Sequence, residues 1–473
     1  MSDGEPGPLW APEAVWQAIP HLAAFFPEGP PRRGPRPAGA VESRPDEGPW
    51  QAPRFGARRV PLALLRPQGP HLVPHLVPHW ADPWRHAPIS AAEGEALLAD
   101  WRRQAAENRG IAAFLGMAGW KRAAIAAAFA HDGPPAPFAA TEAAALALAA
   151  AARARGEPGA IAAWASRAAP GLAGRRAAAG IPLLWVEDGF LRSVGLGVDF
   201  IPSASLAVDA LGPHYDPRQP SALERILAEE AFDAPLLARA AALRRAIVAR
   251  GLTKYNLRRR PPRLPASPGR RRILVVGQVE DDASIALGAG RVRTNLGLLE
   301  AVRRAEPEAF LVFRPHPDVE TGYRRGYVPR RAALRCADAV VAGGDIGGLF
   351  AEVEAVHGIT SLAGFEALLR GLAVTTWGMP FYAGWGLTTD MEPPPRRGRA
   401  LSLDALVAGA LIRYPRYLDP VSQLPCGPEL LLDRLADRAA WPRPSPGRRA
   451  AVLGWRYMGW WLKQCRRFGL WQR

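Results

Sequence analysis

The sequence predicts an α/β protein made of two successive Rossmann-like domains that face a central cleft. Short apolar runs, typical of buried parallel strands, alternate with longer helical stretches. This alternation occurs twice, once within 107–257 and once within 273–440, and the segment 258–272 between them is an Arg/Pro linker without periodicity. Because repeated strand–helix alternation builds parallel sheets, each half predicts one such sheet.

The hydrophobic pattern places the individual elements of each half. The helix that opens at Thr360 or Ser361 runs through Arg370, and Gly371 is expected to end it. The other predicted helices are 140–154, 161–169 and 221–250, and the predicted strands are 182–186, 273–276, 309–313 and 373–377.

The two ends of the chain differ from this pattern. Residues 1–106 form a region rich in Pro, Trp and Arg. The tail, 443–473, interleaves aromatic with basic residues, which is typical of an amphipathic anchor at a membrane surface. A terminal helix that packs back on the N-terminal domain is the alternative for this tail.

Composition limits the function classes. The 473 residues carry a net charge of +16, which favours anionic partners such as nucleic acid, anionic lipid or phosphate-bearing substrates. No RNA-binding motif accompanies the charge, so nucleic acid is not the expected partner. No apolar run approaches 18 residues and no secretory signal is present, and the three cysteines are widely spaced; we therefore expect a soluble, cytoplasmic protein.

An acidic cluster follows the predicted strand 273–276. It contains Glu280, Asp281 and Asp282, with Gln278 just before them. Ligands of open α/β sheets bind outside the carboxyl ends of strands, so carboxylates there are placed for chemistry. The alternative is a solvated acidic turn that caps the next helix.

Two further polar clusters follow strands of the same half. His316 lies between two prolines and beside Arg314, which suits contact with a phosphate oxygen or a leaving group. Thr360 and Ser361 place two hydroxyls at a helix N-terminus, which predicts an anion site, although ordinary capping by Ser361 explains the same residues. Glu366, further along this helix, is a candidate to accept hydrogen bonds from ribose hydroxyls.

Six long motifs, taken together, resemble the capsule polysaccharide β-Kdo glycosyltransferases, where Kdo is 3-deoxy-D-manno-oct-2-ulosonic acid. The resemblance spans about 107–420. The motifs are EDGFLRSVGLG at 187–197, KYN at 254–256, GQVEDDASI at 277–285, RPHPDV at 314–319, HGITSLAGFEALLR at 357–370 and PFYAGWGLTTD at 380–390.

The resemblance implies a GT-B-like fold and transfer from CMP-β-Kdo with retention at the anomeric carbon. It also implies that neither a cofactor nor a metal is needed. The expected acceptor is a lipid-linked saccharide of the phosphatidylglycerol type that already bears Kdo. The protein is then expected on the cytoplasmic face of the inner membrane, as a peripheral protein that works with other capsule biosynthesis and export proteins.

Retention implies two displacements through a covalent adduct with the protein. The family motif Q-x-x-x-D falls on Gln278 and Asp282, which makes Asp282 the expected nucleophile. Asp188 and Asp281 are alternative acid/base residues, and the motif comparison does not choose between them. The residues expected to bind the donor are His316, Pro317, Arg314, Thr360, Ser361 and Glu366, with Lys254, Asn256 and Arg192, of which Lys254 and Arg192 are candidates for the Kdo carboxylate.

The chain departs from the family pattern in two ways. It holds one module where well-known members hold two in tandem, which leaves the linkage, and a first or later Kdo addition, open. The family's His-Thr-x-Thr-Ser has Gly358 in place of its first hydroxyl residue. Two alternative functions are also considered. One is a transferase for another CMP-nonulosonate, since its carboxylate and CMP contacts would look alike; the other is a non-catalytic glycolipid-binding component of capsule assembly or export.

Overall fold

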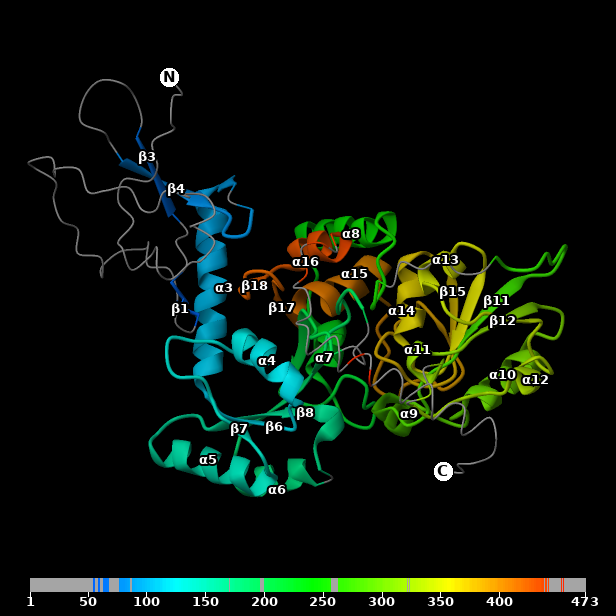
Figure 1. Cartoon of the computed structure of the whole chain (residues 1–473), viewed down its shortest axis with the longest axis horizontal. Helices are drawn as coiled ribbons and strands as arrows, with labels where there is room; N and C mark the ends of the chain where they lie inside the picture. The colour runs from blue at the N-terminus through cyan, green and yellow to red at the C-terminus, as the bar shows by residue number, and fades with distance from the viewer. Residues whose placement is uncertain are drawn as a thin grey trace, which may run out of the picture.

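A computed structural model describes most of residues 76–441, apart from residues 86, 170, 196–199, 257–262, 321, 323, 438 and 440. It also describes the short segments 54–55, 58–59 and 63–67 and residues 452 and 454. Two large sheets lie side by side, each with helices against it (Figure 1). The predicted fold class, α/β with two Rossmann-like domains, is confirmed.

The first sheet has seven strands in the order β18-β17-β10-β9-β8-β6-β7. Strands β6 to β9 pair in parallel, while β10, β17 and β18 add antiparallel pairs at one edge. The strands are β6 (Ile111–Leu115), β7 (Phe138–Ala139), β8 (Ala160–Trp164), β9 (Leu183–Asp188), β10 (Ser205–Asp209), β17 (Pro415–Leu418) and β18 (Pro425–Cys426). The helices that follow or precede them are α4 (Arg122–Ala128), α5 (Glu142–Ala154), α6 (Leu172–Ala178), α7 (Ala222–Glu229) and α8 (Ala234–Ala249), with short 3-10 turns η1 (Gly119–Lys121) and η2 (Ala165–Arg167).

Two predictions for this half are wrong. The stretch 161–169 is not a helix: it forms most of β8 and the turn η2, and every residue of β8 is buried. Alanine favours helices in isolation, but burial between two layers overrides that preference. The segment 221–250 is two helices, because Asp233 caps a second N-terminus and Pro235 occupies its first turn.

The second sheet has six parallel strands in the order β13-β12-β11-β14-β15-β16. Helix α14 (Leu362–Leu369) is capped by Ser361 and ends before Gly371, whose φ of 78° suits only glycine, as predicted. The strands are β11 (Arg272–Val276), β12 (Phe310–Arg314), β13 (Ala339–Val340), β14 (Ala355–Gly358), β15 (Ala373–Thr376) and β16 (Thr389–Asp390). The other helices are α9 (Ala283–Gly288), α10 (Asn295–Ala305), α11 (Pro317–Glu320), α12 (Arg330–Ala333) and α13 (Ile346–Phe350).

The chain then returns to the first sheet. After β16, α15 (Leu403–Val407) and the π-helical turn η4 (Ala408–Arg413) lead to β17 and β18, and α16 (Pro428–Ala436) follows. Helices α15 and α16 pack on α8, and Figure 1 shows this orange segment beside the first sheet. The range 273–440, which the sequence assigns to the second domain, therefore contains a segment that completes the first.

The N-terminal region also packs on this returning segment. Strands β3 (Ala63–Pro67), β4 (Leu76–Ala81) and β5 (Pro88–Ile89) form a small antiparallel sheet, and β1 (Arg54–Phe55) pairs with β2 (Arg58–Arg59). Helix α3 (Ala91–Arg109) buries Trp101 completely, and the Trp101 Nε1 donates to the carbonyl of Pro425 at 3.2 Å. The predicted helix or anchor of 443–473 lies outside the described residues, apart from residues 452 and 454. No helix in the described part of the chain is long and apolar enough to cross a membrane.

Candidate functional site

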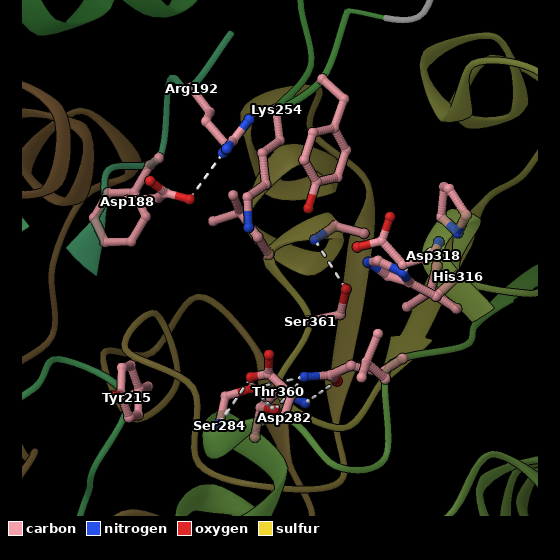
Figure 2. Close-up of a pocket in the computed structure, with 18 of the residues that line it drawn as sticks. Asp188, Arg192, Tyr215, Lys254, Asp282, Ser284, His316, Asp318, Thr360 and Ser361 are labelled. Carbon is pink, nitrogen blue, oxygen red and sulfur yellow. Dashed lines mark hydrogen bonds and ion pairs between the residues drawn. The ribbon is translucent and has the colours of Figure 1, made fainter. Parts of the chain in front are cut away.

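A cavity of about 860 Å³ lies where the carboxyl ends of the two sheets face each other. Figure 2 shows side chains of both halves pointing into it. In the second sheet the strand order reverses between β11 and β14, and ligands of such sheets bind in the crevice at that switch point. The loops after β11 and β14 both line the cavity, so the predicted motifs meet there.

Asp282 is held at this switch point by a hydrogen-bond network. The Gln278 Nε2 donates to the Ser284 hydroxyl at 2.9 Å and to the Thr360 hydroxyl at 2.8 Å, which ties the two loops together. Ser284 donates to the Asp282 Oδ1 from its hydroxyl at 2.7 Å and from its backbone at 3.0 Å. The Asp282 Oδ2 accepts no hydrogen bond from the described residues, so one oxygen is anchored and the other is available to a ligand.

The two other carboxylates of the acidic cluster point elsewhere. Asp281 is exposed and forms an ion pair with Arg324 at 3.2 Å. The Glu280 carboxylate accepts from the backbone of Asn295 at 2.7 Å. Asp282 alone of the three lines the cavity.

His316 is presented as a neutral hydrogen-bond donor. Its Nδ1 accepts from the backbone N–H of Asp318 at 3.1 Å, so the proton of the neutral ring lies on Nε2. Burial lowers the pKa of His316 to about 4. Pro317 starts helix α11 directly after it and also lines the cavity.

The N-terminus of α14 faces the same space. Its cap Ser361 accepts from the backbone of Ala363 at 3.3 Å, and Thr360 donates its own backbone N–H to the side-chain Oε1 of Gln278 at 3.2 Å. Inside the helix, Glu366 is buried and accepts from the backbone of Lys254 at 2.5 Å. Burial raises the pKa of Glu366 to about 7.

On the opposite side, Asp188 lies between two cations. Arg192 donates to it at 2.9 Å and the Lys121 ammonium at 3.0 Å, and that ammonium also lies 3.5 Å from the ring centre of Trp164. Burial acts to raise the pKa of Asp188, but the two cations outweigh it and hold that pKa well below its usual range. The Arg192 guanidinium is 2% exposed and also bonds Ser193 and a backbone carbonyl, so it is committed within the protein.

Of the remaining predicted donor-binding residues, Lys254 is available to a ligand, whereas Arg314 and Asn256 are bonded within the protein. Lys254 extends into the cavity in Figure 2 and forms no ion pair with a described residue. Arg314 lines the cavity, but it is 4% exposed and holds Glu320 at 3.0 Å and the carbonyl of Gly344 at 3.0 Å. Asn256 does not line the cavity, and its amide is bonded to backbone groups of its own loop and of Ser193.

Sequence reasoning did not single out three acids that line the cavity, Asp318, Asp345 and Glu187; of these, Glu187 is the one on the first-sheet side. It lies at the end of β9, and its carboxylate accepts from the backbone N–H of Ser166 at 2.7 Å. Burial raises the pKa of Glu187 to about 7, and the neighbouring Asp188 adds to the shift. Glu187 is the first residue of the motif that also contains Asp188, so the sequence did mark this position. The sequence does not show, however, which of the two adjacent carboxylates is paired with cations. Among the residues that the structure describes, no group of three or more His, Cys, Asp or Glu side chains is arranged to hold a metal ion.

Comparisons with known proteins identify the family of this chain. Residues 159–417 match the family described as capsule polysaccharide biosynthesis protein. The chain is 50% identical to the lipopolysaccharide-processing protein LpsZ of Rhizobium meliloti over 243 residues, which are 50% of this chain and 54% of that protein. It is 45% identical to the capsule polysaccharide modification protein LipA of Neisseria meningitidis serogroup B over 240 residues, which are 51% of this chain and 34% of that protein. The chain thus spans about half or less of the length of these relatives.

Two solved structures from Thermosulfurimonas dismutans are similar along most of their length. The KpsC beta Kdo 2,7 transferase has a TM-score of 0.57 and 32% sequence identity, and the match covers 69% of this chain and 99% of that one. The KpsC beta Kdo 2,4 transferase has a TM-score of 0.53 and 32% identity, and the match covers 59% of this chain and 87% of that one.

Proposed function

The chain belongs to the capsule polysaccharide biosynthesis protein family, and we propose that it is a retaining β-Kdo glycosyltransferase. In this proposal it moves Kdo from CMP-β-Kdo to a lipid-linked acceptor that already bears Kdo. The observation that carries the proposal is Asp282: one carboxylate oxygen is anchored by Ser284, and the other faces the cavity without a partner among the described residues.

The donor occupies the second-sheet side of the cavity. The His316 Nε2–H and the start of α14, at Thr360 and Ser361, bind the CMP phosphate. Glu366 accepts from a ribose hydroxyl. Lys254 binds the Kdo carboxylate, because its ammonium faces the cavity while the Arg192 guanidinium is already committed.

The reaction then proceeds by two displacements at the anomeric carbon. In the first, Asp282 Oδ2 forms a bond to C2 of Kdo while the bond from C2 to the phosphate oxygen breaks and CMP leaves. The donors around the phosphate stabilise the charge that develops on CMP as this bond breaks. In the second, an acceptor hydroxyl attacks C2 from the opposite face, loses its proton, and releases the Asp282 carboxylate, so the configuration is retained.

Glu187 takes the proton from the acceptor hydroxyl in this scheme. A pKa near 7 suits a general base at neutral pH. Asp188, one of the two predicted acid/base residues, is neutralised by Lys121 and Arg192, and its lowered pKa makes it a weak base. The other, Asp281, does not line the cavity.

The cellular setting completes the proposal. We place the protein on the cytoplasmic face of the inner membrane, as a peripheral protein beside other capsule biosynthesis and export proteins. The acceptor is a saccharide on a phosphatidylglycerol-type lipid. No cofactor is required, because His316, Lys254 and the α14 N-terminus meet the charge of the donor.

The experiment is intact-mass analysis after incubation with CMP-β-Kdo alone. The wild type should gain the mass of one Kdo residue and release CMP, and the adduct should map to the peptide that contains Asp282. Asp282→Asn should lose the adduct and lower transfer by on the order of 10⁴-fold, because the group acts on carbon, while CMP binding stays intact. Asp281→Asn is the matched control and should behave as wild type; an adduct that persists in Asp282→Asn would refute the nucleophile assignment.

A further inference from the structure

The first sheet has a switch point of its own. Strand β6 pairs with β7 on one side and with β8 on the other, so the strand order reverses between β6 and β8. The turns that follow these strands are η1 and η2, and both line the cavity. The same rule that predicts the donor site in the second sheet predicts a second ligand position between these two turns.

Arg167, at the end of η2, is the available cation there. It is exposed, lines the cavity, and forms no ion pair or hydrogen bond with a described residue. Lys121 and Arg192, also on this side, are both paired with Asp188, and Lys254 is assigned to the donor. A guanidinium offers a planar fork of donors that matches a carboxylate or a phosphate, and here that fork is unused.

Arg167 is also next to the proposed base. The backbone N–H of its neighbour Ser166 donates to Glu187 at 2.7 Å, so η2 and Glu187 are held together. Across the switch point, Trp120 of η1 is half-buried and meets the ring of Phe200 edge-on, with 6.0 Å between ring centres. Aromatic faces of this kind pack against the C–H face of a sugar ring.

We propose that Arg167 and Trp120 form the acceptor subsite, which selects a saccharide that carries an oxyanion near its accepting hydroxyl. This inference rests on the proposed function and adds the substrate chemistry of the acceptor side. Arg167 holds the oxyanion, Trp120 holds the ring, and the hydroxyl is directed at Glu187. The oxyanion is a carboxylate of the terminal sugar or a phosphodiester of the lipid linker, since both fit the same fork.

The test measures transfer to three synthetic acceptors with wild type and Arg167→Ala. The first acceptor is a Kdo glycoside with a free carboxylate and no phosphate, the second is its methyl ester, and the third is a neutral sugar on a phosphodiester. Arg155→Ala is the matched control: Arg155 is exposed, pairs with Glu157, and precedes β8 where Arg167 follows it. It should behave as wild type.

We expect Arg167→Ala to raise the KM for the free-acid acceptor about 10- to 100-fold, as expected for loss of one charged hydrogen-bonded contact, and to leave the methyl ester unaffected. Arg167→Lys should restore part of this loss. If KM instead rises for the phosphodiester acceptor, Arg167 still binds an oxyanion, and that oxyanion is the phosphodiester of the lipid linker. An equal effect on acid and ester, or no effect on any acceptor, would overturn the subsite.

Adduct formation without acceptor separates this inference from the function on which it rests. Arg167→Ala should form the Kdo adduct and release CMP at the wild-type rate, because the residue does not touch the donor. If the wild type forms no adduct and transfers no Kdo, the proposed function is refuted, and the acceptor subsite is refuted with it. If the wild type transfers Kdo equally well to the free-acid, methyl-ester and phosphodiester acceptors, only the acceptor subsite is refuted.

Discussion

The two sides of the cleft position their polar groups by different physical means. On the second-sheet side, three uncharged side chains, Gln278, Ser284 and Thr360, form the hydrogen-bond network around Asp282. On the first-sheet side, Asp188 is held by two cations in a partly buried ion-pair cluster. Buried ion pairs are costly to disrupt, whereas neutral hydrogen bonds can be exchanged for those of a ligand at smaller cost.

The difference teaches that charge alone does not identify a reactive group in this cavity. Arg192 and Asp188 neutralise each other, so we assign them a supporting role. Lys254 and Arg167 lack such partners among the described residues, so we assign them to ligands. Glu187 lies beside this ion-pair cluster but outside it, and its pKa of about 7 follows from burial without a cation at hydrogen-bonding distance.

Within this comparison, the largest effect is expected from replacing Glu187, which tests whether Glu187, and not the neighbouring Asp188, is the base. Glu187→Gln should lower kcat for transfer by about 10²- to 10⁴-fold, the usual contribution of a general base. The wild-type rate should rise with pH to a plateau above an apparent pKa near 7, because the carboxylate must be ionised to accept the proton. Steady-state rates from pH 5 to pH 9 check this, and a variant that keeps the same profile would assign the limb to another group. Adduct formation from the donor should survive the change.

Arg192 and Lys254 are the next pair to compare. Arg192→Ala leaves Asp188 with one of its two cations, so it should lower the free energy of unfolding by about 3 kcal/mol or more. Lys254→Ala should leave unfolding within about 1 kcal/mol of wild type and raise the KM for CMP-Kdo instead. Urea unfolding and donor titrations measure the two quantities. A stable Arg192→Ala with weak donor binding would reverse the two assignments.

Replacement of His316 tests the second-sheet side of the cleft. His316→Ala should weaken CMP binding by about 10-fold, because one charge-assisted hydrogen bond to the phosphate is lost. Replacement of both Thr360 and Ser361 by Ala should cost less, since the backbone N–H groups at the start of α14 remain. Calorimetry with CMP measures both. Since the pKa of His316 is about 4, its contribution should not change between pH 6 and pH 8, and a steep change there would mean that a charged imidazolium binds the phosphate.

The smallest expected effect is on stability. The pKa of Glu187 is raised from 4.5 to about 7 on folding, so the folded state binds the proton more tightly and stability falls as pH rises through this range. Glu187→Gln should therefore be more stable than wild type by about 1 to 2 kcal/mol at pH 8, with little difference at pH 4.5; the half-buried carboxyl makes this less than the full linkage value. Chemical denaturation at the two pH values checks it. A difference that is equal at both would mean that Glu187 keeps its ordinary pKa.

Some of this protein could be predicted from local sequence. The apolar run 273–276 lies in strand β11, and the run 309–313 overlaps strand β12 apart from its first residue. Gly371 follows the end of α14. These features were predictable because burial pattern and backbone conformation are local properties. The family was also predictable, since its six motifs are contiguous stretches. The alanine-rich β8 was not, because the same residues suit a helix when exposed and a central strand when buried.

The sequence by itself determined which polar residues follow which strands, and hence that Asp282, His316, Thr360 and Ser361 lie at one edge of one sheet. Only the tertiary structure decided which of them face the cavity and which side chains find partners. Asp281 and Asp282 are adjacent in sequence, yet one turns to Arg324 and the other to the cavity. The return of β17 to the first sheet and the pairing of Asp188 with Lys121 join residues far apart along the chain, and such contacts depend on packing and desolvation that no local pattern encodes.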